Sequence, residues 1–386
     1  MVTHQRSAQN PHKRSKASLI ILIMLAFLLL IAAVMMAMSI PEETVLPDTT
    51  VPAETAAASN LGFTCDSVEA QKLFPFGQGV VKLTNNRLAY LTIEGTEVFA
   101  EEIDMASPYV VLSGKRLIAC DREGTSYVVI NEEGVLFKGN REGRLVGASF
   151  AADQTLALIE DRHNSTGVVA ILDALTGQLK YECFFPESGY VLSVRFTPDN
   201  KAFDVVLVNT DGAKAEPLLK RFSIAGEPSG QRILDVEGIY PLVIYDSAGQ
   251  PVLCSDTQLV GVNYEQDDYR FVVDLPRIEA VAETSAEPVV LAGERLGGKL
   301  GIYSLDTAGK LSSPLDVGDQ VTAMTVSGQY VAFGSGTHVY VYDAKSRQMI
   351  LDSNLAAEIV RVDFVDDHLL TVVTGTGVLR LTVEHP

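Results

Sequence analysis

Short runs of residues with high β propensity, separated by Gly, Asp, Asn and Ser, recur in groups of four along most of the chain. One group occupies residues 109–113, 116–121, 126–131 and 134–137, and the same four steps return near the C-terminus, at 321–351. Successive groups are offset by roughly 40 residues, and four strands at that period are typical of a β-propeller blade. The sequence therefore predicts an all-β propeller domain over residues 61–386.

The number of blades depends on how the two ends of this domain are used. Six full groups lie between about residue 104 and residue 358, with three further strands within 77–103 and three within 359–386. The ring must close, because open edges of long strands invite aggregation. If residues 61–68 supply the outer strand of the last blade and 71–76 a short inner strand, the ring has eight blades. If terminal strands lie outside the ring it has seven; we expect eight.

Acidic residues are placed where hairpin turns are predicted. The third strand of a group often ends at an aspartate, as at Asp173, Asp306 and Asp343. Asp side chains bond to the following backbone amides, so we expect turn formation rather than metal binding. No D-x-[DN]-x-[DN]-G calcium loop is present. The pairs Glu101–Glu102 and Glu132–Glu133 are likewise predicted to lie in solvated turns.

Residues 19–38 are twenty consecutive apolar residues. At about 1.5 Å per residue such a helix spans about 30 Å, the thickness of a bilayer core. We predict a transmembrane helix over residues 18–40. A cleaved signal peptide is the main alternative, with a weak cleavage site at 37–39, but its apolar region would be about 7–15 residues. A buried helix of a soluble domain would show a polar face.

Charge on either side of the apolar segment predicts its direction. The tail, residues 1–17, holds four basic residues and no acid: Arg6, Lys13, Arg14 and Lys16. The linker, residues 41–60, holds three prolines and four acids but no Lys or Arg. Positive charge stays on the cytoplasmic side. We therefore expect a single-pass protein of the cell membrane, held by lipid contacts of the helix, with a cytoplasmic tail, an extended linker and an extracytoplasmic propeller.

The rest of the chain is strongly acidic. The net charge is −19, and because the tail contributes +4, the other residues carry −19 − 4 = −23. An acidic body repels nucleic acid, so no nucleic-acid partner is expected.

The apolar segment, the acidic linker and the run LFPFGQGVVKL at residues 73–83 resemble an uncharacterised bacterial family, domain of unknown function family 5711. This resemblance covers most of the chain and implies a location in the bacterial envelope, with no known active site. The repeats also look like quinoprotein and WD40 propellers in general, whose blades usually carry recurring tryptophans. The chain has no Trp, so quinoprotein-type cofactor chemistry is not expected.

The four cysteines form no C-x-x-C pair, which argues against thiol-redox and zinc-ribbon sites. Cys120 and Cys254 occupy the same strand position in blades about three apart, beyond the ~7 Å between Cα atoms that a disulfide tolerates. We expect both to be buried free thiols. A bridge between Cys65 and Cys183 stays open from the sequence alone.

Other catalytic patterns are weak. His163, His338 and His368 are isolated, without the H-x-x-x-H spacing of a metal site. Residues 334–338, GSGTH, do not form a G-x-S-x-G elbow, and no phosphate-binding glycine loop occurs. The sequence therefore predicts no catalytic, cofactor-binding or metal-binding residues.

These observations favour a non-enzymatic binding or scaffolding module at the cell envelope, with a protein or peptide partner. The alternative is an extracellular lyase or hydrolase, with carboxylates or His163 and His338 lining the central channel. A third possibility, ligand sensing, would need a membrane partner because the tail is short. An enzyme should gather His, Arg and acids in the channel, whereas a scaffold should present an apolar or evenly polar surface.

Overall fold

The computed structural model describes residues 58–385, except 163–165, 187–188, 211, 213, 237, 266–267 and 295–297. The chain divides into two compact units, Met1–Pro52 and Ala53–Pro386, and every described residue belongs to the second. The predicted tail, transmembrane helix and most of the linker lie outside the described residues. Within the described part of the chain, no helix is long and apolar enough to cross a membrane.

The second unit contains eight antiparallel sheets of four strands, which we number as blades. Blade 1 consists of β2 (Leu73–Phe76), β3 (Gly79–Leu83), β4 (Arg87–Thr92) and β5 (Glu97–Glu102). Blade 2 consists of β6 (Pro108–Ser113), β7 (Arg116–Asp121), β8 (Ser126–Asn131) and β9 (Gly134–Asn140). Blade 3 consists of β10 (Arg144–Phe150), β11 (Thr155–Arg162), β12 (Thr166–Asp173) and β13 (Leu179–Phe185). Blade 4 consists of β14 (Tyr190–Phe196), β15 (Ala202–Asn209), β16 (Glu216–Ser223) and β17 (Pro228–Ile233).

The remaining four blades follow in chain order. Blade 5 consists of β18 (Leu242–Tyr245), β19 (Pro251–Cys254), β20 (Gln258–Gly261) and β21 (Phe271–Asp274). Blade 6 consists of β22 (Arg277–Ala282), β23 (Val289–Gly293), β24 (Leu300–Ser304) and β25 (Leu315–Val317). Blade 7 consists of β26 (Ala323–Ser327), β27 (Tyr330–Ser335), β28 (His338–Asp343) and β29 (Gln348–Asn354). Blade 8 consists of β30 (Ile359–Asp366), β31 (Leu369–Thr374), β32 (Gly377–Thr382) and β1 (Ala58–Thr64).

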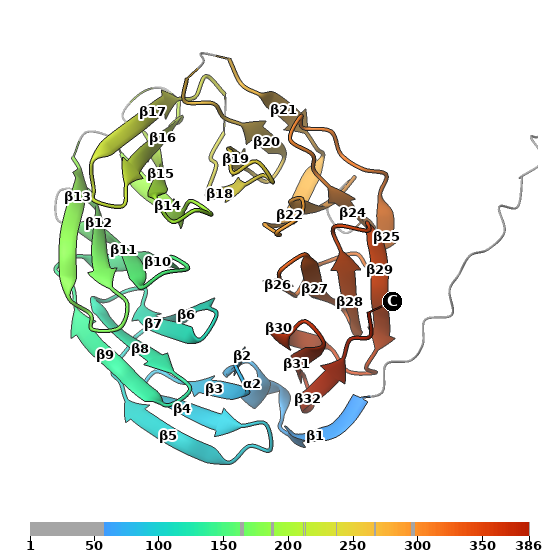
Figure 1. Cartoon of the computed structure of the whole chain (residues 1–386). Coiled ribbons are helices and arrows are strands. Elements are labelled where there is room, and N and C mark those ends of the chain that lie inside the picture. The colour runs from blue at the N-terminus through green and yellow to red at the C-terminus, as the bar shows by residue number, and fades with distance from the viewer. Residues whose placement is uncertain are drawn as a thin grey trace, which may run out of the picture. The chain divides into compact units, whose positions relative to one another are not determined.

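The blades follow one another around a ring, with the first strand of each blade at the central channel and the outer strand at the periphery (Figure 1). The prediction of an eight-bladed all-β propeller is therefore confirmed. A single short helix, α2 (Ser67–Ala70), precedes blade 1.

The ring closes through its N-terminal strand. β1 pairs antiparallel with β32, with Phe63 opposite Val378, and so completes blade 8. Gly62 has φ +152°, and a Cβ there would lie 2.1 Å from the carbonyl oxygen of Val378, so this close approach requires glycine. β1 was predicted over 61–68 but ends at Thr64, because Asp66 caps α2 by accepting a hydrogen bond from the amide of Glu69 at 2.8 Å.

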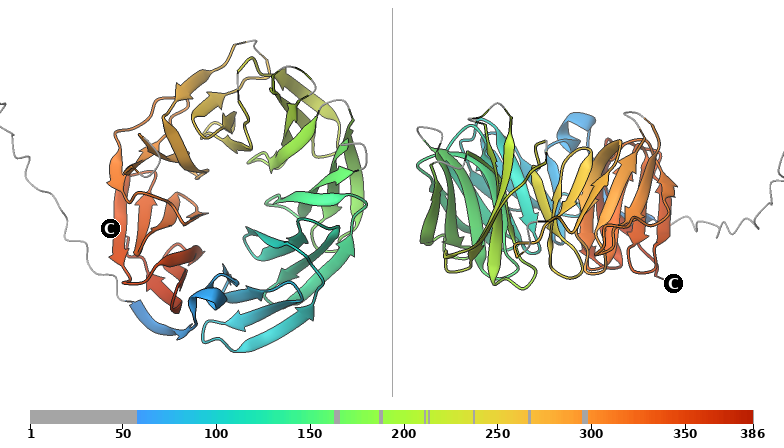
Figure 2. Two further views of the ribbon diagram at one scale, coloured as in Figure 1. Left: turned by 180° about the vertical axis from the view of Figure 1, so that it is seen from behind. Right: turned by 90° about the horizontal axis from the view of Figure 1, so that it is seen from above.

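The antiparallel connections divide the loops between two faces of the ring. Turns between first and second strands, and between third and fourth strands, emerge on one face, which we call the hairpin face. Connections between second and third strands and between blades emerge on the opposite, crossover face. α2 lies on the crossover face, away from the C-terminal end of the chain (Figure 2). Because Ala58 pairs with Leu381 near the end of β32, β1 begins at the hairpin face.

Burial explains why the strands could be read from the sequence. Each blade is covered on both sides by its neighbours, so its middle strands form continuous apolar runs. Residues 117–121 of β7 are all buried, whereas the outer strand β5 has no buried residue. The turn aspartates are also confirmed: the carboxylate of Asp173 accepts from the amides of Leu175 (3.1 Å) and Thr176 (2.9 Å), and Asp306 and Asp343 bind following amides in the same way.

Candidate functional site

The carboxylate of Asp204 on β15 is fully buried and joins blade 4 to blade 5. It accepts two hydrogen bonds from the guanidinium of Arg221, at 2.8 and 2.7 Å. It also accepts from the hydroxyls of Tyr245 (2.9 Å) and Tyr264 (2.7 Å), which belong to blade 5. Burial, and then the Asp204 carboxylate, raises the pKa of Tyr264 well above its usual value, so the phenol stays protonated and donates. This cluster holds blades 4 and 5 together without a tryptophan.

A second buried network lies on the crossover face, between blades 2 and 3. The fully buried carboxylate of Glu160 accepts from Nε of Arg141 at 2.6 Å and from Nε of Arg162 at 3.0 Å. Both guanidinium groups also contact Glu182. Two arginines and two glutamates thus satisfy one another, and no charge of this set is left for a ligand.

The described histidines do not line the channel. His338 lies on β28, the third strand from the channel, with its Nδ1 2.7 Å from a carboxylate oxygen of Asp352 on the outer strand. The alternative that placed His338 at a channel active site is therefore wrong, because the third strand of a blade is separated from the channel by two others. His163 lies outside the described residues. His368 and His385 contact each other near the C-terminus, with ring centroids 4.4 Å apart.

All four cysteines are free thiols. Cys120 on β7 and Cys254 on β19 are buried on the second strands of blades 2 and 5, as predicted. The possible bridge between Cys65 and Cys183 does not form. Burial raises the pKa of Cys120 to about 12 and that of Cys183 to about 11, so both thiols stay protonated and unreactive at neutral pH.

One of the two acid pairs departs from its predicted place, and the other lies in a turn as predicted. Glu101 and Glu102 lie on β5 rather than in a turn, and Glu101 pairs with Lys138 of the next blade. Glu132 is in a turn but is not merely solvated. Its carboxylate accepts from the amide of Gln78 (2.6 Å) and the hydroxyl of Tyr90 (2.9 Å), which joins blade 2 to blade 1.

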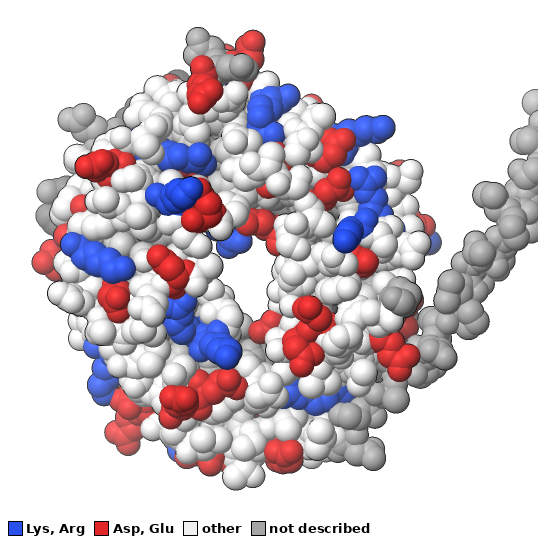
Figure 3. Space-filling view, viewed as in Figure 1, with Lys and Arg blue, Asp and Glu red and all other residues white. Residues whose placement is uncertain are grey.

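The channel wall carries exposed apolar side chains on five of the eight inner strands, with exposed fractions of 36–46%. They are Leu112, Val146, Tyr190, Leu242 and Val326. Tyr190 and Leu242 are the first residues of their strands and so lie at the rim of the channel on the crossover face. Figure 3 shows mostly uncharged surface around the opening, with charges of both signs scattered over the face viewed. Among the described residues, no histidine lies on an inner strand.

Asp363 is the one inner-strand carboxylate whose titration is shifted upward in the described residues. It lies on β30 and accepts a hydrogen bond from the hydroxyl of Thr325 on β26, the inner strand of blade 7. Burial raises the pKa of Asp363 above its usual value. A raised carboxyl pKa favours the folded state at low pH, and that contribution is lost as the pH rises through the folded-state pKa.

We therefore expect Asp363→Asn to raise the melting temperature by a few degrees at pH 7, where the aspartate is ionised in a buried place. The amide oxygen can still accept from Thr325. The gain should shrink below pH 4, where the acid is protonated in both states. Calorimetry from pH 3.5 to pH 8 measures it; a difference that does not change with pH contradicts this assignment.

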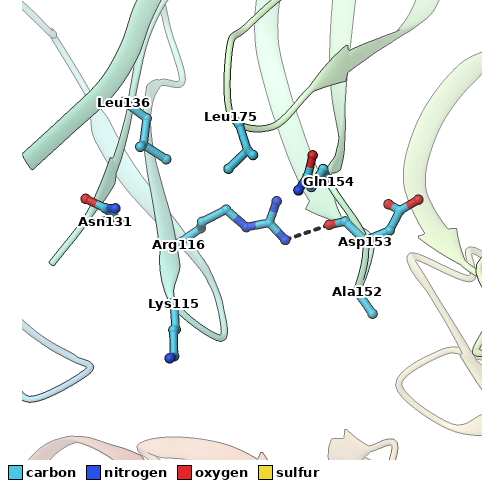
Figure 4. Close-up of a pocket in the computed structure, with 8 residues that line it drawn as sticks. All are labelled: Lys115, Arg116, Asn131, Leu136, Ala152, Asp153, Gln154 and Leu175. Carbon is cyan, nitrogen blue, oxygen red and sulfur yellow. Dashed lines mark hydrogen bonds between the residues drawn. The ribbon is translucent and has the colours of Figure 1, made fainter. Parts of the chain in front are cut away.

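An open hollow of about 650 Å³ lies on the hairpin face between blades 2 and 3. It is formed by four hairpin turns and the start of β9, and its lining is Lys115, Arg116, Asn131, Leu136, Ala152, Asp153, Gln154 and Leu175. Figure 4 shows the guanidinium of Arg116 at its centre, with the two leucines on one side and Lys115 on the other. Basic and aliphatic side chains thus share one concave surface.

A second hollow, of about 490 Å³, lies between blades 3 and 4. Three aromatic rings line it, from Phe184, Phe185 and Phe222, together with Lys220 and Arg221. Phe184 is 56% exposed, which is unusual for a phenylalanine on a strand. The guanidinium of Arg221 is bound to Asp204, so the base beside these rings is Lys220, whose ammonium lies 5.6 Å from the ring centre of Phe185.

The chain matches the family of unknown function DUF5711 over residues 60–381, which is most of its length and nearly all of the propeller. The chain belongs to this family. A comparison with curated proteins finds no match.

Solved structures that resemble the DUF5711 propeller share its fold at low sequence identity. Sqt1 of Saccharomyces cerevisiae has a TM-score of 0.60 at 11% identity, covering 85% of this chain and 100% of that one. BamB of Moraxella catarrhalis has a TM-score of 0.51 at 13% identity, covering 86% and 100%. The WD40 domain of Neurospora crassa Pan2 has a TM-score of 0.51 at 9% identity, covering 73% and 90%. These likenesses establish the propeller fold and nothing about ligands.

Sequence reasoning about the DUF5711 chain missed the hollow centred on Arg116. Its residues come from four separate turns of two blades, so no local motif marks it. One signal was present: Lys115 and Arg116 are adjacent in a predicted hairpin turn of an otherwise acidic domain. Two adjacent bases at an exposed turn, next to aliphatic turn residues, are what could have drawn attention to it.

Proposed function

We propose that this DUF5711 protein is a membrane-anchored, extracytoplasmic propeller that binds a protein or peptide partner without catalysing a reaction. The observation that carries the proposal is the chemistry of the two hollows between blades. Both combine aliphatic or aromatic side chains with bases on an open surface. Polypeptides offer the matching groups, since they carry apolar side chains and carboxylates close together.

The buried charges support a binding role over an enzymatic one. Asp204 and Glu160 are fully buried, and each is committed to arginines or tyrosines that tie blades or strands together. An acid that served in catalysis would need access to a substrate. The most strongly buried carboxylates thus hold the frame on which the surface hollows are built.

The proposed anchor adds to the binding role. Residues 19–38 are all apolar, and the basic residues before them favour an N-terminus in the cytoplasm. A propeller tethered by a linker of about twenty residues stays near other membrane components, which raises its effective concentration for them.

A membrane-impermeant, lysine-reactive cross-linker applied to intact cells tests this proposal. We expect the propeller to be labelled at exposed lysines such as Lys138 and Lys201, and to be joined reproducibly to one or a few envelope proteins identified by mass spectrometry. A chain lacking residues 1–40 is the control and should escape labelling. Absence of labelling of the full chain overturns the topology, and labelling without any reproducible partner overturns the binding role.

A further inference from the structure

The hollow between blades 2 and 3 is a local concentration of positive charge on an acidic domain. Lys115 and Arg116 both line it, and within the described residues neither forms an ion pair with an acidic side chain. Asp153, the acid among the lining residues, binds Arg116 through its backbone carbonyl instead, and Figure 4 shows its carboxylate turned away from the guanidinium. The hollow therefore holds the guanidinium of Arg116 at its centre and Lys115 at its edge, with the ammonium of Lys115 directed away from the guanidinium in Figure 4.

Arg116 is held in place but retains unused donors. Its Nη2 donates to the carbonyl oxygen of Asp153 at 2.7 Å, and the guanidinium lies 5.3 Å from the ring centre of Phe150. Its Nη1 is shielded from solvent and has no hydrogen-bond partner within the described part of the chain. A guanidinium nitrogen without an acceptor costs free energy, and a carboxylate is its best acceptor. A small rotation of the guanidinium toward the hollow would let an anion satisfy it.

The other wall of the hollow is aliphatic. Leu175 is 41% exposed in the turn between β12 and β13, and Leu136 lies beside it on β9 (Figure 4). The side-chain amides of Asn131 and Gln154 also line the hollow. The Oδ1 of Asn131 already accepts from the amides of Glu133 and Gly134, so Asn131 offers its NH₂ group as a donor. A volume of about 650 Å³ falls in the range of small-ligand sites, which is enough for the last two or three residues of a peptide.

We propose that this hollow binds the C-terminal carboxylate of a partner polypeptide whose last side chain is aliphatic. The inference rests on the proposed binding function and names the ligand class for one of its surfaces. At a chain end, the carboxylate, the last side chain and the last peptide amide are all within one residue. That arrangement matches the bases, the two leucines and the two side-chain amides. A free phosphate would leave the leucines without a partner.

The test uses the purified full chain in detergent micelles and a panel of fluorescent hexapeptides that differ in their last residue. Each peptide is prepared as the free acid and as the C-terminal amide, and binding is measured by fluorescence anisotropy. We expect peptides ending in Leu, Ile or Val to bind at least tenfold more tightly as acids than as amides. Inorganic phosphate should compete poorly.

Variants separate recognition from folding. Arg116→Gln should abolish the difference between acid and amide, and Leu175→Asp should weaken binding of both forms at least tenfold. Lys201→Ala, at an exposed position on blade 4, is the control and should bind like the parent. Urea unfolding midpoints of all variants should stay close to that of the parent, which shows that any loss is not misfolding.

Three outcomes overturn this inference. They are equally tight binding of acids and amides, binding of an amide-capped peptide with an internal glutamate as tight as that of a free-acid peptide, and competition by phosphate as strong as that by the peptide. If cross-linking in cells finds partners and no peptide of the panel binds, only the ligand assignment falls. If cross-linking finds none, the proposed function falls as well.

Discussion

Replacing Asp204 by alanine is expected to lower the free energy of unfolding of the propeller by about 3–5 kcal/mol, the cost of breaking a buried ion pair by removing one partner. The reason lies in the groups left behind. Arg221 would lose both acceptors and the hydroxyl of Tyr264 would lose its own, whereas the hydroxyl of Tyr245 would keep the carbonyl oxygen of Arg195 at 3.1 Å. Urea denaturation followed by circular dichroism should show a lower midpoint with an unchanged slope.

Two further variants make this result specific. Asp199→Ala, at an exposed turn next to the same strand, removes a carboxylate that is 56% exposed and bonded to the nearby Thr197 and Lys201, and should change the unfolding free energy by less than about 1 kcal/mol. Asp204→Leu combined with Arg221→Met removes both charges and should recover much of the loss. If Asp204→Ala unfolds at the same urea concentration as the parent, the cluster does not hold the two blades together.

The fold was largely predictable because its signal is local. The middle strands of a blade are buried on both sides, so residues such as 117–120 form an unbroken apolar run, which Asp121 ends at a turn. The number of blades, seven or eight from the sequence, depended on whether the terminal strands join the ring, and the pairing of β1 with β32 makes it eight. The end of β1 was misplaced because its boundary depends on the side chain of Asp66 capping α2, a detail finer than strand propensity.

The contacts between blades could not be predicted, because they join residues far apart in the sequence. Asp204 meets Tyr264, sixty residues away, through the packing of two blades. Neither residue stands out in the sequence, which contains 49 acidic residues and 13 tyrosines. The chain has no tryptophan, and the sequence did not show that arginine, carboxylate and tyrosine join neighbouring blades.

The candidate site was missed for the same reason. Arg116 and Leu175 come to opposite sides of one hollow only because blades 2 and 3 pack side by side. The search for catalytic motifs looked for fixed spacings within one segment, whereas this surface is assembled from turns of two blades. Aspartates that end strands were predictable, since their partners are amides two or three residues away.

The largest effect is expected from opening the ring. Deleting residues 362–386 removes β31, β32 and most of β30, and it leaves β1 without the strand with which it pairs. Arg361 would become the last residue of the chain and would lose the strand that holds it in place. Its guanidinium now lies 4.0 Å from the ring centre of Phe74 and donates to the carbonyl oxygen of Leu73 at 3.1 Å, so that it fastens blade 8 to blade 1.

The free energy lost with the buried side chains of the deleted segment exceeds the total stability of a typical domain. The deleted segment contributes seven buried apolar side chains: Val362, Leu370, Val372, Val373, Val378, Leu381 and Val383. At about 1.5–3 kcal/mol each they represent roughly 10–20 kcal/mol, against a typical total stability of about 5–15 kcal/mol. We therefore expect the truncated chain to show no cooperative thermal transition by circular dichroism.

A matched chain that begins at Ala53 loses only the first compact unit and should keep the melting temperature of the full-length propeller. A chain that begins at residue 66 lacks β1 alone and should melt at an intermediate temperature, because blade 8 then keeps its three inner strands. A cooperative transition at the parent temperature in the C-terminally truncated chain would show that blade 8 is dispensable and that closure does not hold the ring together.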